Sequence, residues 1–248
     1  MGAPWKSPAL WVGLLFVFLL VDMRQFEPAF AWVFPDVHPA IFNRAGFIEL
    51  FWRHLELVAA AIGAAAVAGI GLAVFVTRPA GRDFRTMVNV AATIGQTFPP
   101  AAVLALAVPA LGFGPRPTIV ALFLYGLLPI VENAIAGIEG VPAAVRDAAR
   151  GMGLSRWQIL RDVELPLAAP VILAGVRVSV TIGIGTATIG SVVGALTLGT
   201  PIFDGLAGNK LPFVIQGAVL VALFAILTDM LFARLEDWLQ PPRARRRV

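Results

Sequence analysis

The sequence predicts an all-α, polytopic membrane protein with about six transmembrane helices. Two observations carry this prediction. First, 58% of the 248 residues are hydrophobic and only 14% are charged, whereas soluble domains carry about 25% charged residues. Second, uncharged runs are long enough to cross ~30 Å of hydrocarbon, which takes about 20 helical residues. The apolar excess excludes a soluble fold and a disordered chain, and the lack of Cys excludes disulfide frameworks and thiolate metal sites.

Six segments are candidate membrane spans. In order they are residues 9–21, 57–76, 86–115, 117–138, the stretch from Pro166 through Arg177 to residue 203, and 211–228, which Asp229 closes. The clearest is 57–76, which contains no charged residue. The span 86–115 is interrupted by Pro99-Pro100 and Pro109, and a proline inside a helix removes a backbone hydrogen bond and kinks or breaks it.

The segment 9–21 also has the length of the apolar region of a signal peptide. Ala29-Phe30-Ala31 offers a cleavage pattern of the matching kind. Against cleavage, Asp22, Arg24 and Glu27 make the intervening region long and charged. We therefore expect the first span to be retained.

The distribution of Lys and Arg between alternate loops predicts the orientation of the spans. With both termini in the cytoplasm, the cytoplasmic segments hold Lys6, Arg78, Arg82, Arg85, Arg146, Arg150, Arg156, Arg161, Arg234, Arg243, Arg245, Arg246 and Arg247. The opposite side holds fewer, namely Arg24, Arg44, Arg53, Arg116 and Lys210. We predict a multi-pass protein of the inner (plasma) membrane with both termini cytoplasmic. The C-terminal Arg run is interpreted as charge that faces anionic headgroups, so no nucleic-acid partner is expected.

Residues 139–166 form the one loop long enough to hold ordered structure outside the membrane. Pro142 suits the first position of a helix, and residues 143–150 are Ala-rich and favour helix. Gly151 and Gly153 then offer a stop. A first short cytoplasmic helix is predicted here.

A second short helix is predicted after these glycines. Ser155 and Gln158 have the spacing of a capping box, in which each side chain bonds the other residue's backbone N–H. The helix is expected to end at Leu165, because Pro166 disfavours helical backbone in the residue before it. The loop therefore places two short helices at an angle on the cytoplasmic side.

The helix pair has three interpretations. It superficially resembles a helix-turn-helix DNA reader, but apolar spans begin within a few residues on both sides, so neither helix reaches a major groove. The pair is otherwise an amphipathic connector without a partner, or a docking element whose small Ala148 and Ala149 let a partner's groove approach the backbone. The residue pattern alone leaves these last two open.

A longer motif in this loop favours the docking element. The motif Asp147-Ala148-Ala149-x3-Gly153-x9-Val163-x-Leu165-Pro166 resembles the cytoplasmic "EAA" motif of permease subunits in binding-protein-dependent ABC importers. Its spacing matches throughout, with Asp147 in place of Glu and Val163 in place of Ile. The resemblance covers about residues 54–236.

Within that family, the sequence is most similar to the branch that imports osmoprotectants such as glycine betaine, choline and carnitine. The stretches that carry this resemblance are Gln96-Thr97-Phe98-Pro99-Pro100, 121–130 (ALFLYGLLPI), 151–158 (GMGLSRWQ) and 183–188 (GIGTAT). Two features depart from it. Glu132 stands where this branch more often has a basic or neutral residue, and the turn 194–199 is less rich in glycine.

The resemblance implies a domain order and a set of partners. Residues 1–50 would hold an N-terminal span and a periplasmic connector, 51–236 the five-helix permease core with the coupling loop 139–166, and 237–248 a basic cytoplasmic tail. Two permease subunits, identical or related, would enclose the path within the lipid bilayer. Two ABC ATPase subunits would bind below and an extracytoplasmic binding protein would deliver the substrate.

The same resemblance assigns no enzyme activity and no cofactor to this chain. It has no Walker A motif, so ATP and Mg²⁺ are expected on the separate ATPase. The residues expected to couple the permease to that ATPase are Asp147, Ala148, Ala149, Gly151, Gly153, Leu165 and Pro166.

Candidate residues of the translocation path lie in two places. Gln96 and Thr97 precede the Pro99-Pro100 break, and Thr186, Thr188 and Ser191 recur on the fifth span. Irregular backbone at membrane depth is tolerated beside a cavity or inside protein. For the three hydroxyl residues, helix packing is favoured over contact with substrate, because glycines accompany them.

Glu132 is the remaining path candidate, as a guide for a cationic substrate. A salt bridge or a carboxylate that reaches the membrane boundary is the favoured interpretation of its charge.

Three rival functions remain. The same permease could carry another small polar solute such as an amino acid. A membrane-embedded enzyme would need a metal pair, a Ser with a His base or paired aspartates, and the sequence shows no such set, so no catalytic and no metal-ligating residue is assigned. His38 and His54 are isolated and expected at the interface. A scaffold that transports nothing would leave the EAA-like motif unexplained.

Overall fold

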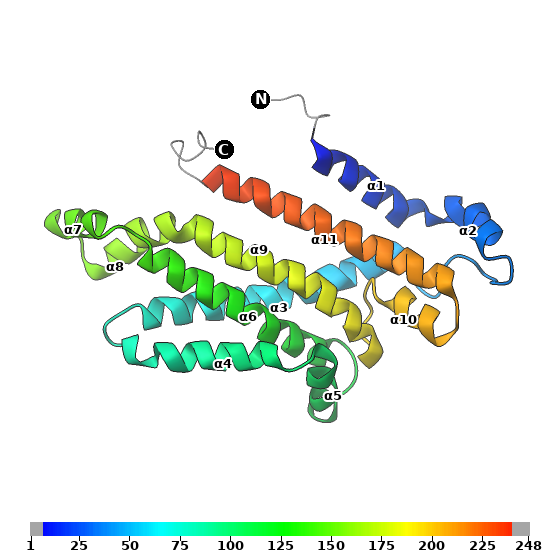
Figure 1. Ribbon diagram of the computed structural model, residues 1–248, viewed down its shortest axis with the longest axis horizontal. Coiled ribbons are helices and arrows are strands. Elements are labelled where there is room, and N and C mark those ends of the chain that lie inside the picture. Colours follow the sequence, from blue (N-terminus) through cyan, green and yellow to red (C-terminus); the bar gives the residue numbers. More distant parts are fainter. Residues whose placement is uncertain (1–6, 240–248) are drawn as a thin grey trace. The chain divides into compact units, whose positions relative to one another are not determined.

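The computed structural model describes residues 7–239, and every regular element within that range is a helix. In order, the elements in Figure 1 are α1 (Pro8–Asp22), η2 (Met23–Phe26), α2 (Glu27–Val33), α3 (Phe47–Val76), η3 (Arg82–Phe84), α4 (Arg85–Thr97), α5 (Pro100–Leu111), α6 (Pro115–Glu139), α7 (Ala143–Gly151), α8 (Arg156–Gln158), η4 (Ile159–Glu164), α9 (Leu165–Ile189), η5 (Gly190–Val193), α10 (Thr200–Ala207) and α11 (Leu211–Leu239). Lys6 and the basic residues Arg243, Arg245, Arg246 and Arg247 lie outside the described range.

The helical architecture and the number of spans agree with the prediction. Within residues 7–239, five helical stretches are long and apolar enough to cross a membrane: Pro8–Val33, Phe47–Val76, Pro115–Glu139, Arg156–Val193 and Leu211–Leu239. A sixth candidate is the pair Arg82–Thr97 and Pro100–Leu111, which bends by 94° at the break. The break falls where Pro99-Pro100 was expected to interrupt the helix, because Pro99 adopts extended backbone and Pro100 begins α5.

Three of the predicted boundaries are wrong. The helix predicted at 57–76 begins at Phe47, and the last span continues past Asp229 to Leu239. Charged residues do not end these helices, since their side chains form ion pairs such as Arg53–Glu56 and Arg177–Glu236. The uncharged run that reaches residue 203 is not one helix, because α9 ends at Ile189.

Glycines flank the 3-10 turn η5 that follows α9. Gly194 ends η5 with a φ of +84°, in the left-handed region that L side chains rarely adopt. Gly190 lies against Thr118, and a Cβ at Gly190 would lie 2.6 Å from the Thr118 methyl carbon. The uncharged segment beyond Ile189 is therefore η5 and a partly buried turn followed by α10, and not a longer span.

The helix predicted to stop at Leu165 does not stop there. The chain runs from α8 through η4, a π turn, directly into α9, which contains Pro166. In an α-helix the Pro166 ring would clash with the carbonyl of Asp162 four residues earlier. A π turn bonds to the fifth residue back and widens the backbone there, which relaxes that clash.

The chain divides into two compact units, and each is described by itself. Unit 1 comprises Met1–Ala61, Pro99–Leu122 and Thr181–Leu231. Its packing includes the rings of Phe16, Phe51 and Phe224, whose centroids lie 5.2–5.9 Å apart. Gln216 of α11 joins the connector before α3, since it accepts the Phe42 N–H at 3.0 Å and donates to the Ala40 carbonyl at 2.8 Å.

His54 lies in unit 1, and the expectation that it is interfacial is wrong. Its residue surface is 0% exposed. Nδ1 accepts the Leu198 N–H at 3.3 Å, so Nε2 is the nitrogen that donates to the Ile184 carbonyl at 3.1 Å. A neutral imidazole thus satisfies two backbone groups of the α9–α10 region. His38 is exposed, as expected of an interfacial residue.

Unit 2 comprises Ile62–Phe98, Phe123–Val180 and Phe232–Val248. Its buried core is built from α3, α4, α6 and α9 through Ala73, Val76, Val88, Val131, Ala134, Ile135, Ile138, Ala168 and Ile172. Helices α6 and α9 run side by side (Figure 1) and approach closely at Gly175, where a Cβ would lie 2.6 Å from Asn133 Cβ and 2.7 Å from the Pro129 carbonyl oxygen. Helices α7 and α8 belong to this unit.

Candidate functional site

Helix α7 carries most of the predicted coupling residues. Within it, Ala149 is 1% exposed and packs into unit 2, whereas Asp147 and Ala148 are exposed. Asp147 pairs with Arg150 in the same helix at 2.8 Å. The two alanines therefore differ, since Ala148 offers backbone surface to a partner and Ala149 holds α7 to its own chain.

Helix α7 ends at the two glycines where the sequence predicted a stop. Gly151 is its last residue and Gly153 has a φ of +81°. This region is exposed and includes two large apolar side chains, since Met152 is 73% exposed and Trp157 is 66% exposed. An apolar pair at this exposed tip is a surface suited to a partner protein.

The second helix begins with the predicted capping box. Ser155 Oγ accepts the Gln158 N–H at 3.3 Å, and Gln158 Oε1 accepts the Ser155 N–H at 2.8 Å. Pro142 is the residue before α7 and not its first residue, with extended backbone at ψ 136°. Of the other two predicted coupling residues, Leu165 begins α9 half-buried and Pro166 is exposed.

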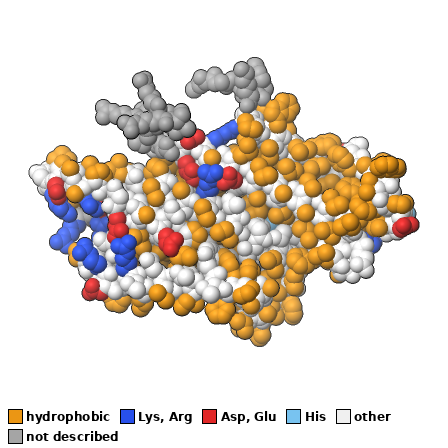
Figure 2. Space-filling view, in the orientation of Figure 1, with side chains coloured by type: hydrophobic (Ala, Val, Ile, Leu, Met, Phe, Trp, Pro, Cys, Tyr) orange, Lys and Arg blue, Asp and Glu red, His pale blue; other side chains and the backbone are white. Residues whose placement is uncertain are grey.

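A basic cleft of about 430 Å³ lies beside α7. Its walls come from the turn after α3, from α7 and from α8, through Thr77, Arg78, Pro79, Arg82, Ala143, Arg146, Asp147, Arg150, Arg156, Ile159 and Glu164. Figure 2 shows Lys and Arg side chains gathered over the end of unit 2 that carries α7 and α8. This end of the unit presents positive charge beside the exposed apolar tip.

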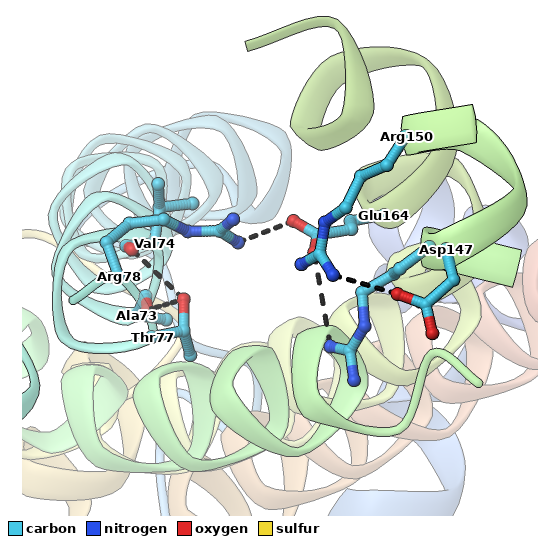
Figure 3. Close-up of polar contacts among 8 residues, drawn as sticks. Ala73, Val74, Thr77, Arg78, Asp147, Arg150 and Glu164 are labelled. Carbon is cyan, nitrogen blue, oxygen red and sulfur yellow. Dashed lines mark hydrogen bonds and ion pairs between the residues drawn. The ribbon is translucent and has the colours of Figure 1, made fainter. Parts of the chain in front are cut away.

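The residue patterns did not indicate the ionic centre of this cleft. Glu164 has a side chain only 5% exposed and lies 2.5 Å from Arg78 (Figure 3). It also lies 4.0 Å from Arg146. A signal was present in the sequence, since Glu164 is an acid next to the Leu-Pro of the EAA-like motif. The spacing of that motif leaves this position open and so gave no reason to examine it.

Gln96, Thr97 and Glu132 belong to unit 2. Gln96 donates from Nε2 to the Tyr125 carbonyl of α6 at 2.5 Å, which holds the end of α4 just before its break. Thr97 is exposed, and its hydroxyl bonds the Thr93 carbonyl at 2.9 Å. Glu132 is exposed on α6, and no ion pair joins it to another residue of the range 7–239. The cation guide and the carboxylate that reaches the boundary therefore both remain open for Glu132.

Tyr125 is a polar residue of unit 2 that the sequence analysis did not single out for its hydroxyl. The hydroxyl is buried and bonds to no residue of the described range. It lies on the helix that Gln96 contacts.

Thr186, Thr188 and Ser191 belong to unit 1. Thr186 is 7% exposed. The Thr188 hydroxyl donates to the Gly185 carbonyl in its own helix. Ser191 Oγ lies 2.8 Å from Thr197 Oγ1 and 3.2 Å from Thr200 Oγ1. Two of the three hydroxyls are thus engaged within unit 1, that of Thr188 in its own helix and that of Ser191 with the turn that follows. The packing role and the path role of these residues stay predictions.

The sequence matches a known family over most of its length. The profile of the family described as "Binding-protein-dependent transport system inner membrane component" matches residues 65–241. Osmoprotectant import permease protein OsmY of Salmonella typhimurium is 45% identical over 77% of this chain and 81% of its own. Carnitine transport permease protein OpuCD of Listeria monocytogenes is 38% identical over 83% and 92%. Glycine betaine/carnitine/choline transport system permease protein OpuCB of Bacillus subtilis is 37% identical over 76% and 85%.

Solved structures share the fold. A chain of the MetNI methionine ABC transporter in an inward-facing conformation superposes with a TM-score of 0.69 over 78% of this chain and 96% of that one. A chain of an amino acid ABC transporter crystallised with histidines superposes with a TM-score of 0.60 over 88% and 96%. Their identities of 22% and 17% restrict this likeness to the fold.

Proposed function

This chain belongs to the family of inner membrane components of binding-protein-dependent transport systems, and from that membership we propose that it is the permease subunit of an ATP-driven importer for an osmoprotectant-type quaternary amine. The observation that carries the substrate class is the set of relatives between 37% and 45% identical, named for osmoprotectants, carnitine, choline and glycine betaine. The substrate is glycine betaine, choline, carnitine or proline under this proposal.

The orientation follows from the charge at the α7 end of unit 2. Arg78, Arg82, Arg146, Arg150 and Arg156 line or border one cleft there. Basic residues concentrate in cytoplasmic loops, so this end faces the cytoplasm and both chain termini lie on that side of the inner membrane.

ABC ATPase subunits dock on α7 and its tip. The exposed Ala148, Met152 and Trp157 and the neighbouring positive cleft support this assignment. ATP and Mg²⁺ bind to those subunits, and this chain holds no cofactor. A second permease subunit, identical or related, completes the path in the bilayer, and an extracytoplasmic binding protein supplies affinity for the substrate.

The path residues stay part of this proposal. Gln96 and Thr97 end α4 at its break, and Glu132 is exposed on α6. Irregular backbone and a carboxylate at membrane depth suit a weakly held cation. Helix packing, ahead of contact with substrate, is the role proposed for Thr186, Thr188 and Ser191.

Uptake by the reconstituted complex tests the substrate. Permease, ATPase and binding protein are placed in proteoliposomes with labelled glycine betaine, choline, carnitine, proline and one unrelated amino acid. Saturable, ATP-dependent uptake of a quaternary amine is the expected result. Uptake of the amino acid alone, with hydrolysis stimulated by the binding protein, would contradict the proposed substrate class and leave the assignment as a permease in place.

The docking surface is tested with a matched pair of exposed alanines. Ala148→Arg on α7 is expected to lower ATPase co-purification about tenfold, equal to a loss of about 1.4 kcal/mol. Ala207→Arg, at the end of α10, is the control and retains binding, since Ala207 is equally exposed but belongs to another short helix. Ala149 is unsuitable for this test, because a charge at a buried position disturbs unit 2 itself. Equal ATPase binding by both variants would refute the docking role of α7.

A further inference from the structure

A buried carboxylate connects three elements of unit 2. Glu164 Oε2 accepts a hydrogen bond from Arg78 Nη2 at 2.5 Å, and Glu164 Oε1 lies 4.0 Å from Arg146 Nη1. Arg78 follows α3, Arg146 lies on α7, and Glu164 is the last residue of the π turn that leads into α9. The dashed contact from Arg78 to Glu164 in Figure 3 crosses from the end of α3 to this turn. We call these three residues the Glu164 clamp.

The Arg78 side of the clamp is firmly attached to α3. The Thr77 hydroxyl donates to the Ala73 carbonyl at 2.8 Å, and the Arg78 N–H donates to the Phe75 carbonyl at 3.1 Å. The turn then folds back so closely that a Cβ at Gly81 would lie 2.2 Å from the Phe75 carbonyl oxygen. Arg78 therefore cannot shift with Glu164 unless the end of α3 shifts too.

The Arg146 side of the clamp orients α7. Apart from Ala149, most of α7 is exposed, and the chain leaves it through Gly151 and the positive-φ Gly153. Backbone hydrogen bonds close this turn, from the Gly153 N–H to the Arg150 carbonyl at 2.9 Å and from the Leu154 N–H to the Ala149 carbonyl at 3.2 Å, but the turn joins α7 only to α8. The contact between Arg146 and Glu164 is a second connection from α7 to α9, and it bypasses the glycines.

The clamp is better suited to fixing geometry than to adding stability. Burying a carboxylate costs several kcal/mol, which an ion pair only about repays. Arg78 Nε is also buried without a partner in the described range, so the guanidinium is not optimally satisfied. A buried pair that contributes little net stability still sets the relative position of the elements that carry it.

We propose that Glu164 is a positioning residue that makes α7 move as one body with α3 and α9. The proposal rests on the proposed function, since the ATPase is the partner that moves α7. When the ATPase pair closes, the clamp transmits the displacement of α7 to two membrane spans. Without the clamp, α7 is held to unit 2 by the buried Ala149 and by its turn to α8, neither of which contacts α3 through an ion pair, and ATP is hydrolysed with less movement of the spans.

The test measures uptake per ATP hydrolysed in the reconstituted complex. Glu164→Gln retains the shape of the side chain and removes its charge, and the ratio of uptake to hydrolysis is expected to fall by at least about fivefold, the lower end of ordinary coupling between two sites. Asp162→Asn is the matched control. Asp162 lies on the same π turn, its side chain is 56% exposed, and its ion pair is with the adjacent Arg161. The control is expected to retain the wild-type ratio.

Two further variants separate positioning from general structure. Arg78→Lys keeps a charge that reaches Glu164 and is expected to retain most of the coupling, whereas Arg78→Gln is expected to lose as much as Glu164→Gln. ATPase co-purification is measured for each variant, because Arg78 and Glu164 also line the cleft beside α7. Weaker docking lowers uptake and hydrolysis together and leaves their ratio unchanged, whereas loss of the clamp lowers the ratio itself. A wild-type ratio in both Glu164→Gln and Arg78→Gln would overturn the proposal, as would an equal loss in Asp162→Asn.

The experiment also distinguishes this proposal from the substrate assignment. If the wild-type complex hydrolyses ATP but carries no quaternary amine, the substrate assignment is wrong. The clamp is then tested by a second measurement, the factor by which the loaded binding protein stimulates ATP hydrolysis in each variant. If Glu164→Gln does not accumulate in the membrane, Arg146→Gln tests the same clamp, since the Arg146 side chain is 28% exposed and the Glu164 side chain 5%, so its replacement disturbs the interior less. Unchanged stimulation in that variant would count against the clamp.

Discussion

Among the described residues, the buried polar side chains of unit 1 are neutral, whereas those of unit 2 include a carboxylate. In unit 1 the fully buried polar groups include His54 and Gln216, which are neutral and bond to backbone N–H and C=O groups. In unit 2 the buried polar groups are Ser179, whose hydroxyl donates to the Gly126 carbonyl at 2.7 Å, and Glu164, which bonds to the guanidinium of Arg78. The charged group, Glu164, is the one whose partner is another side chain.

The difference reflects what each side chain holds. Gln216 and His54 satisfy backbone groups of irregular segments, at residues 40–42 and 198, which would otherwise be buried without partners. Glu164 joins elements whose own backbone is already hydrogen-bonded within helices and turns. Neutral side chains thus fix loops in unit 1, whereas a charged side chain fixes the relative position of helices in unit 2.

The largest effect is expected where helices touch in unit 2. Gly175→Leu places a side chain where a Cβ alone would lie 2.7 Å from the Pro129 carbonyl oxygen, so α6 and α9 must separate. We expect a loss of about 3 kcal/mol or more, seen as poor accumulation in the membrane and a lower melting temperature in detergent.

The control lies on the same helix in unit 1. Gly185 has no atom within 4 Å of its Cβ position, so Gly185→Leu is expected to be neutral or slightly stabilising, because leucine favours helix over glycine. Equal destabilisation by the two substitutions would show that glycine is needed along the whole of α9 and not at one contact.

The neutral network of unit 1 is tested by Gln216→Leu. This change leaves the Phe42 N–H and the Ala40 carbonyl buried without their side-chain partner, at a cost of about 2 kcal/mol. Thermal unfolding of the purified protein measures it. Gln25→Leu, which removes only an exposed hydrogen bond to Asp22, is the control, and a similar shift in both variants would mean that burial is not the cause.

Much of this architecture could be predicted from the residues. The Pro99-Pro100 break, the capping box at Ser155 and the glycine stop after α7 are all local, because each depends on atoms within a few residues. The local rule that a helix ends before a proline failed at Pro166, because the π turn η4 lets the helix continue through it. A π turn is rare, and nothing in the adjacent residues indicates one.

Long-range partners explain the remaining differences. His54 looked isolated because its partners are the backbone groups of Ile184 and Leu198, which no residue type marks. Glu164 was missed for a related reason, since Arg78 lies far from it in the chain. Charge counts along the sequence indicate the side of the membrane, but the fold alone decides which Arg meets which carboxylate.

The smallest effect is expected for the exposed ion pair of unit 2, and it separates burial from charge. Arg85 and Glu139 lie 2.6 Å apart, nearly the distance within the clamp, but their side chains are 43% and 44% exposed. Glu139→Gln is expected to change the free energy of unfolding by less than about 1 kcal/mol, because solvent screens exposed pairs. A double-mutant cycle with Arg85→Gln measures the coupling at low and at ~0.15 M salt, where charges are screened over about 8 Å. A coupling above about 2 kcal/mol that resists salt would show that charge alone, without burial, holds the helices of unit 2, and the contrast between Glu164 and the neutral residues of unit 1 would then lose its physical basis.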